Sequence, residues 1–149
     1  MEQPKRKNLR LQNYDYSSAN YYFVTICTAG KKCIFGKPGK LNALGQIAER
    51  NLLEISEHFP NGEIDCYVIM PNHIHLILII QENGPDLSTV IGSYKSSVSK
   101  KVHKIFPALK IWQTSFYDHI IRNEQSCNEI RKYIADNPRR WNEDKYYCE

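Results

Sequence analysis

The fold is decided by Val68-Ile69-Met70-Pro71-Asn72-His73-Ile74-His75-Leu76-Ile77-Leu78-Ile79-Ile80. Its apolar, β-branched residues predict two strands, with Pro71 and Asn72 in a tight turn between them. Residues two apart on a strand point to the same face, so we expect His73 and His75 to project side by side. Further along the strand, the histidine face continues through Ile77 and Ile79, and the other face comprises Ile74, Leu76, Leu78 and Ile80.

The two histidines have two interpretations. Imidazoles held in parallel on a rigid strand make a ready pair of metal ligands. Half-buried strand histidines can also satisfy their hydrogen bonds with neighbouring groups and bind nothing. The tripeptide alone leaves both interpretations open.

Composition indicates one globular domain. The chain has 149 residues, of which 42% are hydrophobic and 24% are charged, as in a soluble globular protein. We expect a single domain over residues 1–149, with a basic N-terminal arm at about residues 1–16. The longest apolar run, 76–80, is too short to cross a bilayer, so no membrane partner is expected. The basic N-terminus has no apolar stretch behind it, which argues against a secretory signal and predicts a cytoplasmic protein.

The five cysteines are scattered and form no Cys-x-x-Cys pair. This pattern argues against a disulfide framework and against a cysteine zinc site. We expect most of these residues to be small core side chains.

The order of predicted elements indicates the fold class. Strands are expected at 21–28, 64–70 and 73–80, with a further short strand within 111–121. Apolar residues at helical spacing predict helices over 41–59 and from residue 87 until Pro107 stops it. A third helix is capped by Asn123 or Ser126 and runs to about Asn137. The sequence therefore predicts an α+β fold, a ferredoxin-like antiparallel sheet with helices packed on it.

The third predicted helix carries the other half of a candidate site. Tyr133 and Asn137 are four residues apart, so their side chains lie on one helix face, next to its apolar stripe. Asn137 can instead be a simple stop signal before Pro138, and Tyr133 can be an ordinary core aromatic. With His73 and His75, however, an amide oxygen gives three corners of a divalent metal site. A phenol, a poor nucleophile at neutral pH, would then lie beside a metal-bound phosphate.

Positive charge is unevenly spread although the formal net charge is only +4. A solvated basic surface is one interpretation, and a polyanionic partner is the other. A row of hydroxyl and ammonium groups on the second long helix suits phosphates, and a basic N-terminal arm can hold bases by stacking on Tyr14 and Tyr16. The residues predicted to bind nucleic acid are Ser93, Lys95, Ser97, Lys100, Lys101 and Lys104 on the helix, and Lys5, Arg6, Lys7 and Arg10 on the arm.

Five segments together resemble a known family. They are 22–28 (YFVTICT), 68–75 (VIMPNHIH), 91–96 (IGSYKS), 111–113 with 116–122 (IWQ, FYDHIIR) and 133–138 (YIADNP). In this order they resemble the HUH single-tyrosine transposases, in particular the REP-associated tyrosine transposase branch of the transposase IS200-like family. A lone His-x-His motif is weak evidence, but this ordered set is specific and spans nearly the whole chain.

The resemblance implies an HUH endonuclease architecture in which Tyr133 is the nucleophile and His73, His75 and Asn137 hold Mg²⁺ or Mn²⁺. The implied activity is DNA transposition. The tyrosine cleaves single-stranded DNA near a hairpin, forms a 5′-phosphotyrosine bond and releases a 3′-hydroxyl that can reseal the strand. The implied protein is a nucleoid-associated monomer or homodimer.

Two other functions remain open. The chain can be a domesticated, catalytically silent protein that binds hairpin DNA through its basic row. A water-using phosphodiesterase is less well supported, because no Asp or Glu is placed as a general base. The sequence specifies neither the DNA sequence recognised nor the roles of His119 and Arg122.

Overall fold

The computed structural model describes residues 19–148, and the predicted N-terminal arm lies outside this range. The elements, in chain order, are β1 (Ala19–Cys27), η1 (Ala29–Lys31), β2 (Gly36–Lys37), β3 (Lys40–Leu41), α1 (Ala43–Leu53), α2 (Ile55–His58), β4 (Gly62–Ile69), β5 (His73–Gln81), α3 (Leu87–Val102), β6 (Tyr117–Ile121), α4 (Glu124–Asp136) and η2 (Pro138–Glu143). None of the helices in this part of the chain is long and apolar enough to cross a membrane.

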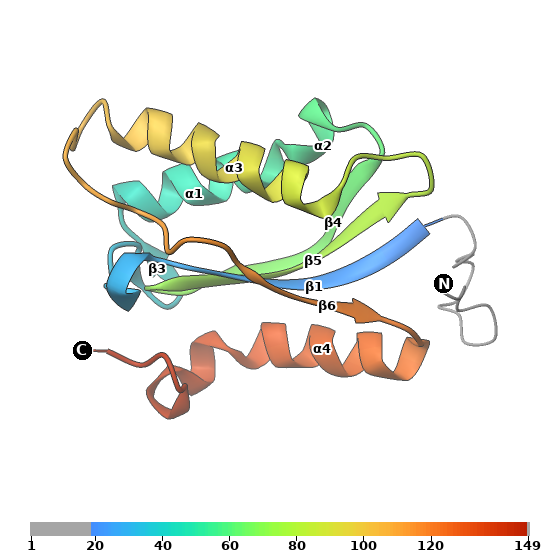
Figure 1. Cartoon of the computed structure of the whole chain (residues 1–149). Helices are drawn as coiled ribbons and strands as arrows, with labels where there is room; N and C mark the ends of the chain where they lie inside the picture. Colours follow the sequence, from blue (N-terminus) through green and yellow to red (C-terminus); the bar gives the residue numbers. More distant parts are fainter. Residues whose placement is uncertain (1–18, 149) are drawn as a thin grey trace.

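The main sheet is antiparallel, with strand order β4-β5-β1-β6. Strands β2 and β3 form a separate two-stranded ribbon. Helices α1 and α3 cover one face of the main sheet and α4 covers the other (Figure 1). Strands β1, β4, β5 and β6 with helices α1 and α3 give the order strand-helix-strand-strand-helix-strand of the ferredoxin-like arrangement, to which α4 is added on the other face. The predicted fold class is therefore confirmed.

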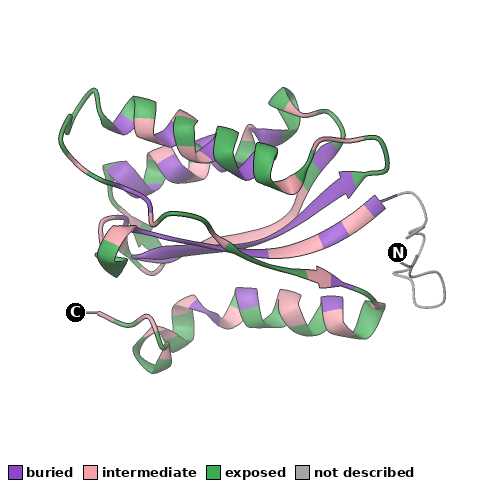
Figure 2. Cartoon of the chain, in the orientation of Figure 1, coloured by how far each residue is buried: buried purple, intermediate pink, exposed green. Residues whose placement is uncertain are grey.

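The predicted hairpin is β4 followed by β5. Ile69 pairs with Ile74, and the Met70 amide donates to the His73 carbonyl at 2.8 Å across the turn. Strand β5 lies between β4 and β1, so both of its edges are hydrogen-bonded. Figure 2 shows it buried along nearly its whole length, and only Gln81 at its end is exposed.

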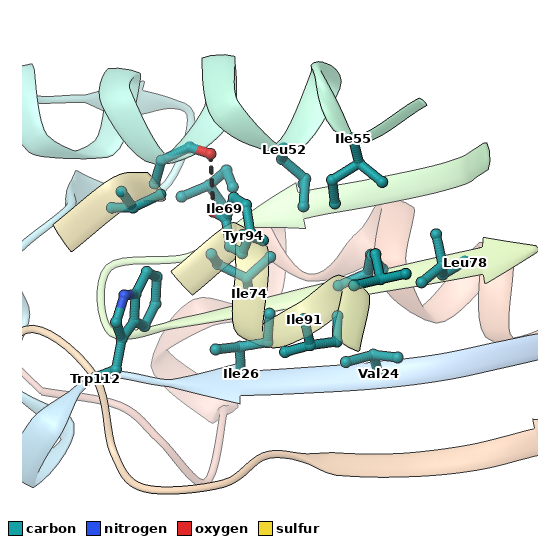
Figure 3. Close-up of a cluster of buried hydrophobic side chains, with 14 of the residues drawn as sticks. Val24, Ile26, Leu52, Ile55, Ile69, Ile74, Leu78, Ile91, Tyr94 and Trp112 are labelled. Carbon is teal, nitrogen blue, oxygen red and sulfur yellow. Dashed lines mark hydrogen bonds between the residues drawn. The ribbon is translucent and has the colours of Figure 1, made fainter. Parts of the chain in front are cut away.

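The larger core lies between the sheet and helices α1 and α3 (Figure 3). One face of β5 supplies Ile74, Leu76, Leu78 and Ile80, as the alternation predicted. From α3, Tyr94 packs into this core, and its hydroxyl donates to the Ala48 carbonyl of α1 at 2.8 Å. Each buried aliphatic side chain contributes roughly 1.5–3 kcal/mol, so this face holds the domain together.

The second core lies between the sheet and α4. It joins Ile77 and Ile79 of β5 to Cys127 and Ile134 of α4. The Asn123 side chain accepts from the Ser126 amide at 2.8 Å and so caps this helix, one of the two predicted possibilities. The Arg131 guanidinium clamps α4 to β4 by donating to both carboxylate oxygens of Asp65, at 2.8 and 2.9 Å.

The two long helices on the other face end earlier than predicted. The helix expected over 41–59 breaks at Glu54, shortly after Asn51 donates its side chain to the Ile47 carbonyl, a contact that bends helices. Helix α3 ends at Val102 rather than just before Pro107. Ile105, predicted to continue the apolar stripe of α3, lies past its end and is 54% exposed.

The prediction against disulfides is wrong for one pair of cysteines. Cys33 and Cys148 form a disulfide although 115 residues separate them in sequence. Within the described residues, Cys27, Cys66 and Cys127 are free thiols, two of them buried as predicted. The spacing of the cysteines gave no sign of this pair, because only the folded chain brings the two residues together.

Candidate active site

His73 and His75 lie side by side on the face of β5 that α4 covers. Their ring centroids are 4.7 Å apart, and both residues are buried. They share this face with Ile77 and Ile79, which continue it into the second core. The predicted strand pattern therefore places both imidazoles where the sheet meets α4.

Asn72 fixes the orientation of His73. Its side-chain nitrogen donates to the carbonyls of Lys31 and Tyr146, at 3.0 and 2.7 Å. The amide oxygen must therefore face the His73 ring, where it accepts from Nδ1 at 2.9 Å. With the proton held on Nδ1, the Nε2 atom of His73 keeps a free lone pair.

His75 has an analogous partner. Its Nδ1 lies 2.9 Å from the Thr25 hydroxyl on the neighbouring strand β1. The hydroxyl oxygen can accept a hydrogen bond from Nδ1–H, which again leaves the Nε2 lone pair free to bind a cation. Such partners on the second ring nitrogen hold metal-binding histidines in position.

Both imidazoles are neutral at pH 7. Burial lowers the pKa of His73 to about 4, against the opposing influence of the Asp144 carboxylate and the Asn137 amide. Burial, with the neighbouring His73, lowers the pKa of His75 to about 3. The neutral ring is the form that binds a cation.

Helix α4 brings Tyr133 and Asn137 to the histidines. The Tyr133 ring lies 5.3 Å from the His75 ring and 6.3 Å from the Phe23 ring, between centroids. Tyr133 is 46% exposed, so a substrate can reach its hydroxyl. Asn137 is buried at the end of α4, close enough to His73 to influence its pKa. The predicted four-residue spacing therefore places a phenol and an amide against the histidine pair.

The buried polar atoms at this point fit a divalent cation. Considering only the described residues, four buried side-chain atoms have no hydrogen-bond partner: His73 Nε2, His75 Nε2, Asn137 Oδ1 and Asp144 Oδ2. An unpaired buried polar atom is costly, and four together call for a shared partner. The amide and carboxylate oxygens suit hard divalent cations, and the imidazole nitrogens also accept softer ones.

No pre-assembled group of three or more His, Cys, Asp or Glu side chains that could hold a metal is found in residues 19–148. The candidate centre is instead a histidine pair and an amide, with a carboxylate beside one ring. This centre is supported by the set of four buried side-chain atoms without a hydrogen-bond partner and by the neutral imidazole rings of His73 and His75.

Sequence reasoning missed the residues that follow α4. After η2 the chain turns back over the histidines, and the Tyr146 ring lies 4.5 Å from the His73 ring, between centroids. The Trp141 ring lies 6.2 Å from the same ring. Asp144 Oδ2 is 3.7 Å from His73 Nε2. These positions have no periodic pattern, so no local signal marked them.

Two clefts meet at Tyr133. One, of about 540 Å³, also contains His75, Lys31, Lys145 and Tyr117. The other, of about 530 Å³, is lined by nine residues: Glu129, Lys132, Tyr133, Asp136, Asn137, Arg140, Glu143, Asp144 and Lys145. Both clefts contain cationic side chains that the sequence analysis did not select.

The predicted basic row lies on α3, with Lys104 just past the end of the helix, and α3 covers the opposite face of the sheet from the histidines (Figure 1). Ser97 and Lys101 both donate to Asn51 Oδ1, at 2.7 and 2.9 Å. Lys95 donates to two backbone carbonyls, of Gln113 and Ser115, each at 2.9 Å. Ser93, Lys100, Lys101 and Lys104 are exposed, and Lys95 and Ser97 are partly buried. The structure therefore does not bring this row to Tyr133.

The roles of the other residues singled out in the sequence stay open. His119 and Arg122 are both exposed, His119 on β6 and Arg122 just after it. His119 pairs in register with Phe23. Lys5, Arg6, Lys7 and Arg10 of the predicted arm fall outside the described residues.

Comparison with known proteins points to one family. The pattern of the family described as "Transposase IS200 like" matches residues 15–137. An uncharacterized protein of Haemophilus influenzae is 32% identical, over 97% of this chain and 94% of its own length. The REP-associated tyrosine transposase of Escherichia coli is 32% identical over 62% of this chain, and the match spans 53% of that protein.

Among solved structures, a REP-associated tyrosine transposase bound to a REP hairpin has the same fold. The TM-score is 0.62 at 23% identity, and the match covers 81% of this chain and 67% of that one. The sequence matches and the shared fold agree with each other. The chain belongs to the transposase IS200-like family and is homologous to the REP-associated tyrosine transposases.

Proposed function

We propose that this protein is a metal-dependent single-stranded DNA endonuclease and strand transferase that uses Tyr133 as its nucleophile. The observation that carries the proposal is the position of Tyr133. Its half-exposed ring lies 5.3 Å from the ring of His75, whose Nε2 is one of the unpaired buried atoms. A solvent-accessible phenol beside free ligand atoms suits transfer of a phosphodiester.

His73, His75 and Asn137 would hold Mg²⁺ or Mn²⁺. When bound there, such a cation supplies charge neutralisation at the phosphate oxygens. The chain's own contribution is rigid placement of the ligand atoms. Asn72 and Thr25 orient the two rings, and the clamp between Arg131 and Asp65 holds α4 on the sheet.

The proposed reaction conserves a phosphodiester bond. Tyr133 Oη attacks a backbone phosphorus, an O–P bond to tyrosine forms, and the bond between phosphorus and the 3′ oxygen breaks. The leaving 3′ oxygen ends as a hydroxyl, and the phenol proton balances its charge. In the reverse direction a 3′-hydroxyl attacks the 5′-phosphotyrosine and reseals the strand, so no nucleotide cofactor is consumed.

The cationic side chains around Tyr133 are proposed to hold the strand at the cleavage point. Lys31, Lys132, Arg140 and Lys145 line the two clefts and can contact phosphates. The homologous REP-associated transposase bound to a REP hairpin supports a folded hairpin as the neighbouring part of the substrate.

More distant DNA contacts are proposed for the residues that the sequence analysis selected. On and just after α3 these are the exposed Ser93, Lys100, Lys101 and Lys104 and the partly buried Lys95 and Ser97. Lys95, Ser97 and Lys101 would have to share their present hydrogen-bond partners with the DNA. On the N-terminal arm they are Lys5, Arg6, Lys7 and Arg10. We propose that the protein acts as a monomer or homodimer on nucleoid DNA in the cytoplasm.

The substitution Tyr133→Phe tests the nucleophile. We expect it to abolish the covalent protein–DNA adduct formed with Mn²⁺ or Mg²⁺ on a hairpin-bearing single strand, as seen on a denaturing gel. Hairpin binding should stay near the wild-type level, because only one hydroxyl is lost.

Tyr147→Phe is a matched control, since Tyr147 is 44% exposed and lies in the same part of the molecule. It should form the adduct normally. An undiminished adduct in Tyr133→Phe would refute the assignment. Tight hairpin binding without any cleavage by the wild-type chain would instead indicate a catalytically silent DNA-binding protein.

A further inference from the structure

Asp144 presents an unpaired carboxylate oxygen to the candidate metal centre. Its side chain is only 4% exposed, and its Oδ2 lies 3.7 Å from His73 Nε2. In the described part of the chain neither atom has a hydrogen-bond partner. Buried carboxylates are normally paired or bound to a cation.

The separation of these two atoms favours a shared cation. A distance of 3.7 Å exceeds that of a hydrogen bond. Because Asn72 holds the His73 proton on Nδ1, the neutral ring turns a lone pair toward the carboxylate. Two ligand atoms that each lie about 2.1 Å from one cation are at most about 4.2 Å apart. The observed separation falls within that limit. Because the described residues contain no ready-made group of three such ligands, the cation would have to draw His73, His75 and Asp144 together.

The chain holds this carboxylate in place from several directions. The Tyr146 amide donates to Asp144 Oδ1 at 2.8 Å, which leaves Oδ2 as the oxygen free to bind. The Tyr146 carbonyl accepts from Asn72 Nδ2 at 2.7 Å, the same side chain that orients His73. The disulfide between Cys33 and Cys148 ties the end of this segment to the loop after β1.

We infer that Asp144 Oδ2 is a fourth protein ligand of the divalent cation, supplied by the segment after η2 that crosses the histidine pair. The inference rests on the proposed function, because it concerns the same cation. It adds one negative charge to a ligand set that otherwise has none. A carboxylate among the ligands favours hard cations such as Mn²⁺ and Mg²⁺ over softer ones that two imidazoles alone would accept.

The test is Mn²⁺ binding by the full-length chain without DNA, with affinity from isothermal titration calorimetry and free Mn²⁺ from electron paramagnetic resonance. We expect Asp144→Asn to raise the Kd for Mn²⁺ by about tenfold or more. Glu143→Gln is the matched control. Glu143 is the neighbouring residue, its side chain is 65% exposed, and the substitution removes the same negative charge. Its Kd should stay within about twofold of wild type, since screened surface charges act weakly.

A second variant guards against a fold defect. Asp144→His should keep a ligand atom but move the preference from Mn²⁺ toward Zn²⁺, measured by competition between the two ions. Thermal unfolding of each metal-free variant, followed by circular dichroism, reports whether it is folded. Equal Mn²⁺ affinity of a folded Asp144→Asn variant and wild type, or tighter binding by the variant, would overturn the inference.

The outcomes also separate this inference from the proposed function. If His73→Ala and His75→Ala lose Mn²⁺ binding while Asp144→Asn retains it, the histidine centre stands and Asp144 is not a ligand. If the wild-type chain binds no Mn²⁺, both the metal-dependent function and the inference fail.

Discussion

The two faces of the central sheet differ in composition, although the strand β5 contributes side chains to both. Toward α1 and α3, its side chains are entirely aliphatic and belong to the larger core. Toward α4, the same strand presents His73 and His75 before it returns to Ile77 and Ile79. Adjacent residues such as Ile74 and His75 therefore belong in turn to the larger core and to the candidate site.

The comparison shows how a small domain can keep unpaired polar atoms in its interior. The aliphatic face is fully packed, and β5 is hydrogen-bonded on both edges. This rigid support lets the opposite face hold four polar atoms that find no partner within residues 19–148. Substitutions on the two faces should accordingly separate activity from stability.

Among substitutions in β5, the largest effect on activity is expected from His75→Gln on the site face. It removes a candidate metal ligand while keeping a polar side chain beside Thr25. We expect the rate of DNA cleavage to fall on the order of 100- to 1000-fold, because electrostatic stabilisation of the reacting phosphate is lost. The measurement is a single-turnover cleavage assay with Mn²⁺, with circular dichroism to show that the variant is folded. A cleavage rate within threefold of wild type would contradict the role given to this face.

Leu76→Ala, on the next residue and the opposite face, should have the converse effect. Leu76 is fully buried in the larger core, and its truncation should lower the free energy of unfolding by about 3 kcal/mol. Chemical denaturation measures this loss. The folded fraction should still cleave DNA and bind Mn²⁺ with near wild-type constants. A selective loss of metal binding in this variant would show that the two faces are not independent.

A smaller effect is expected from the surface lysines, and it compares the two helix layers directly. Lys132→Ala, on α4 at the cleft beside Tyr133, should weaken single-strand binding a few-fold. The slope of log affinity against log salt should fall by about 0.7 for one lost phosphate contact. Lys100→Ala on α3 should weaken binding and reduce the salt slope by similar amounts if that helix also contacts the DNA. An unchanged salt slope for either variant would exclude that lysine from the DNA path.

Local patterns in the sequence were enough to predict how the histidine pair and the pair on the third helix are each oriented. The period-two alternation after Asn72 places His73 and His75 on one face, and that face is the one observed. The four-residue spacing of Tyr133 and Asn137 likewise places both on the side of α4 that meets the sheet. Such periodicities survive folding because they follow from backbone geometry alone.

Other features depend on contacts between distant parts of the chain. Asn51, just before the break at Glu54, accepts hydrogen bonds from Ser97 and Lys101 of α3, contacts that helical spacing does not encode. The basic row of α3 was predicted from its own periodicity. Only the layer order shows that it lies on the far side of the sheet from Tyr133.

The sequence by itself determined the fold class through the order of its elements, and the orientation of the histidine pair and of the phenol and amide through short-range periods. Only the tertiary structure brought Asp144 to His73 and Cys33 to Cys148. The segment after Pro138 has no repeating pattern, and Arg140 leaves helical geometry within η2. Where such a segment lies is decided by the surfaces it packs against.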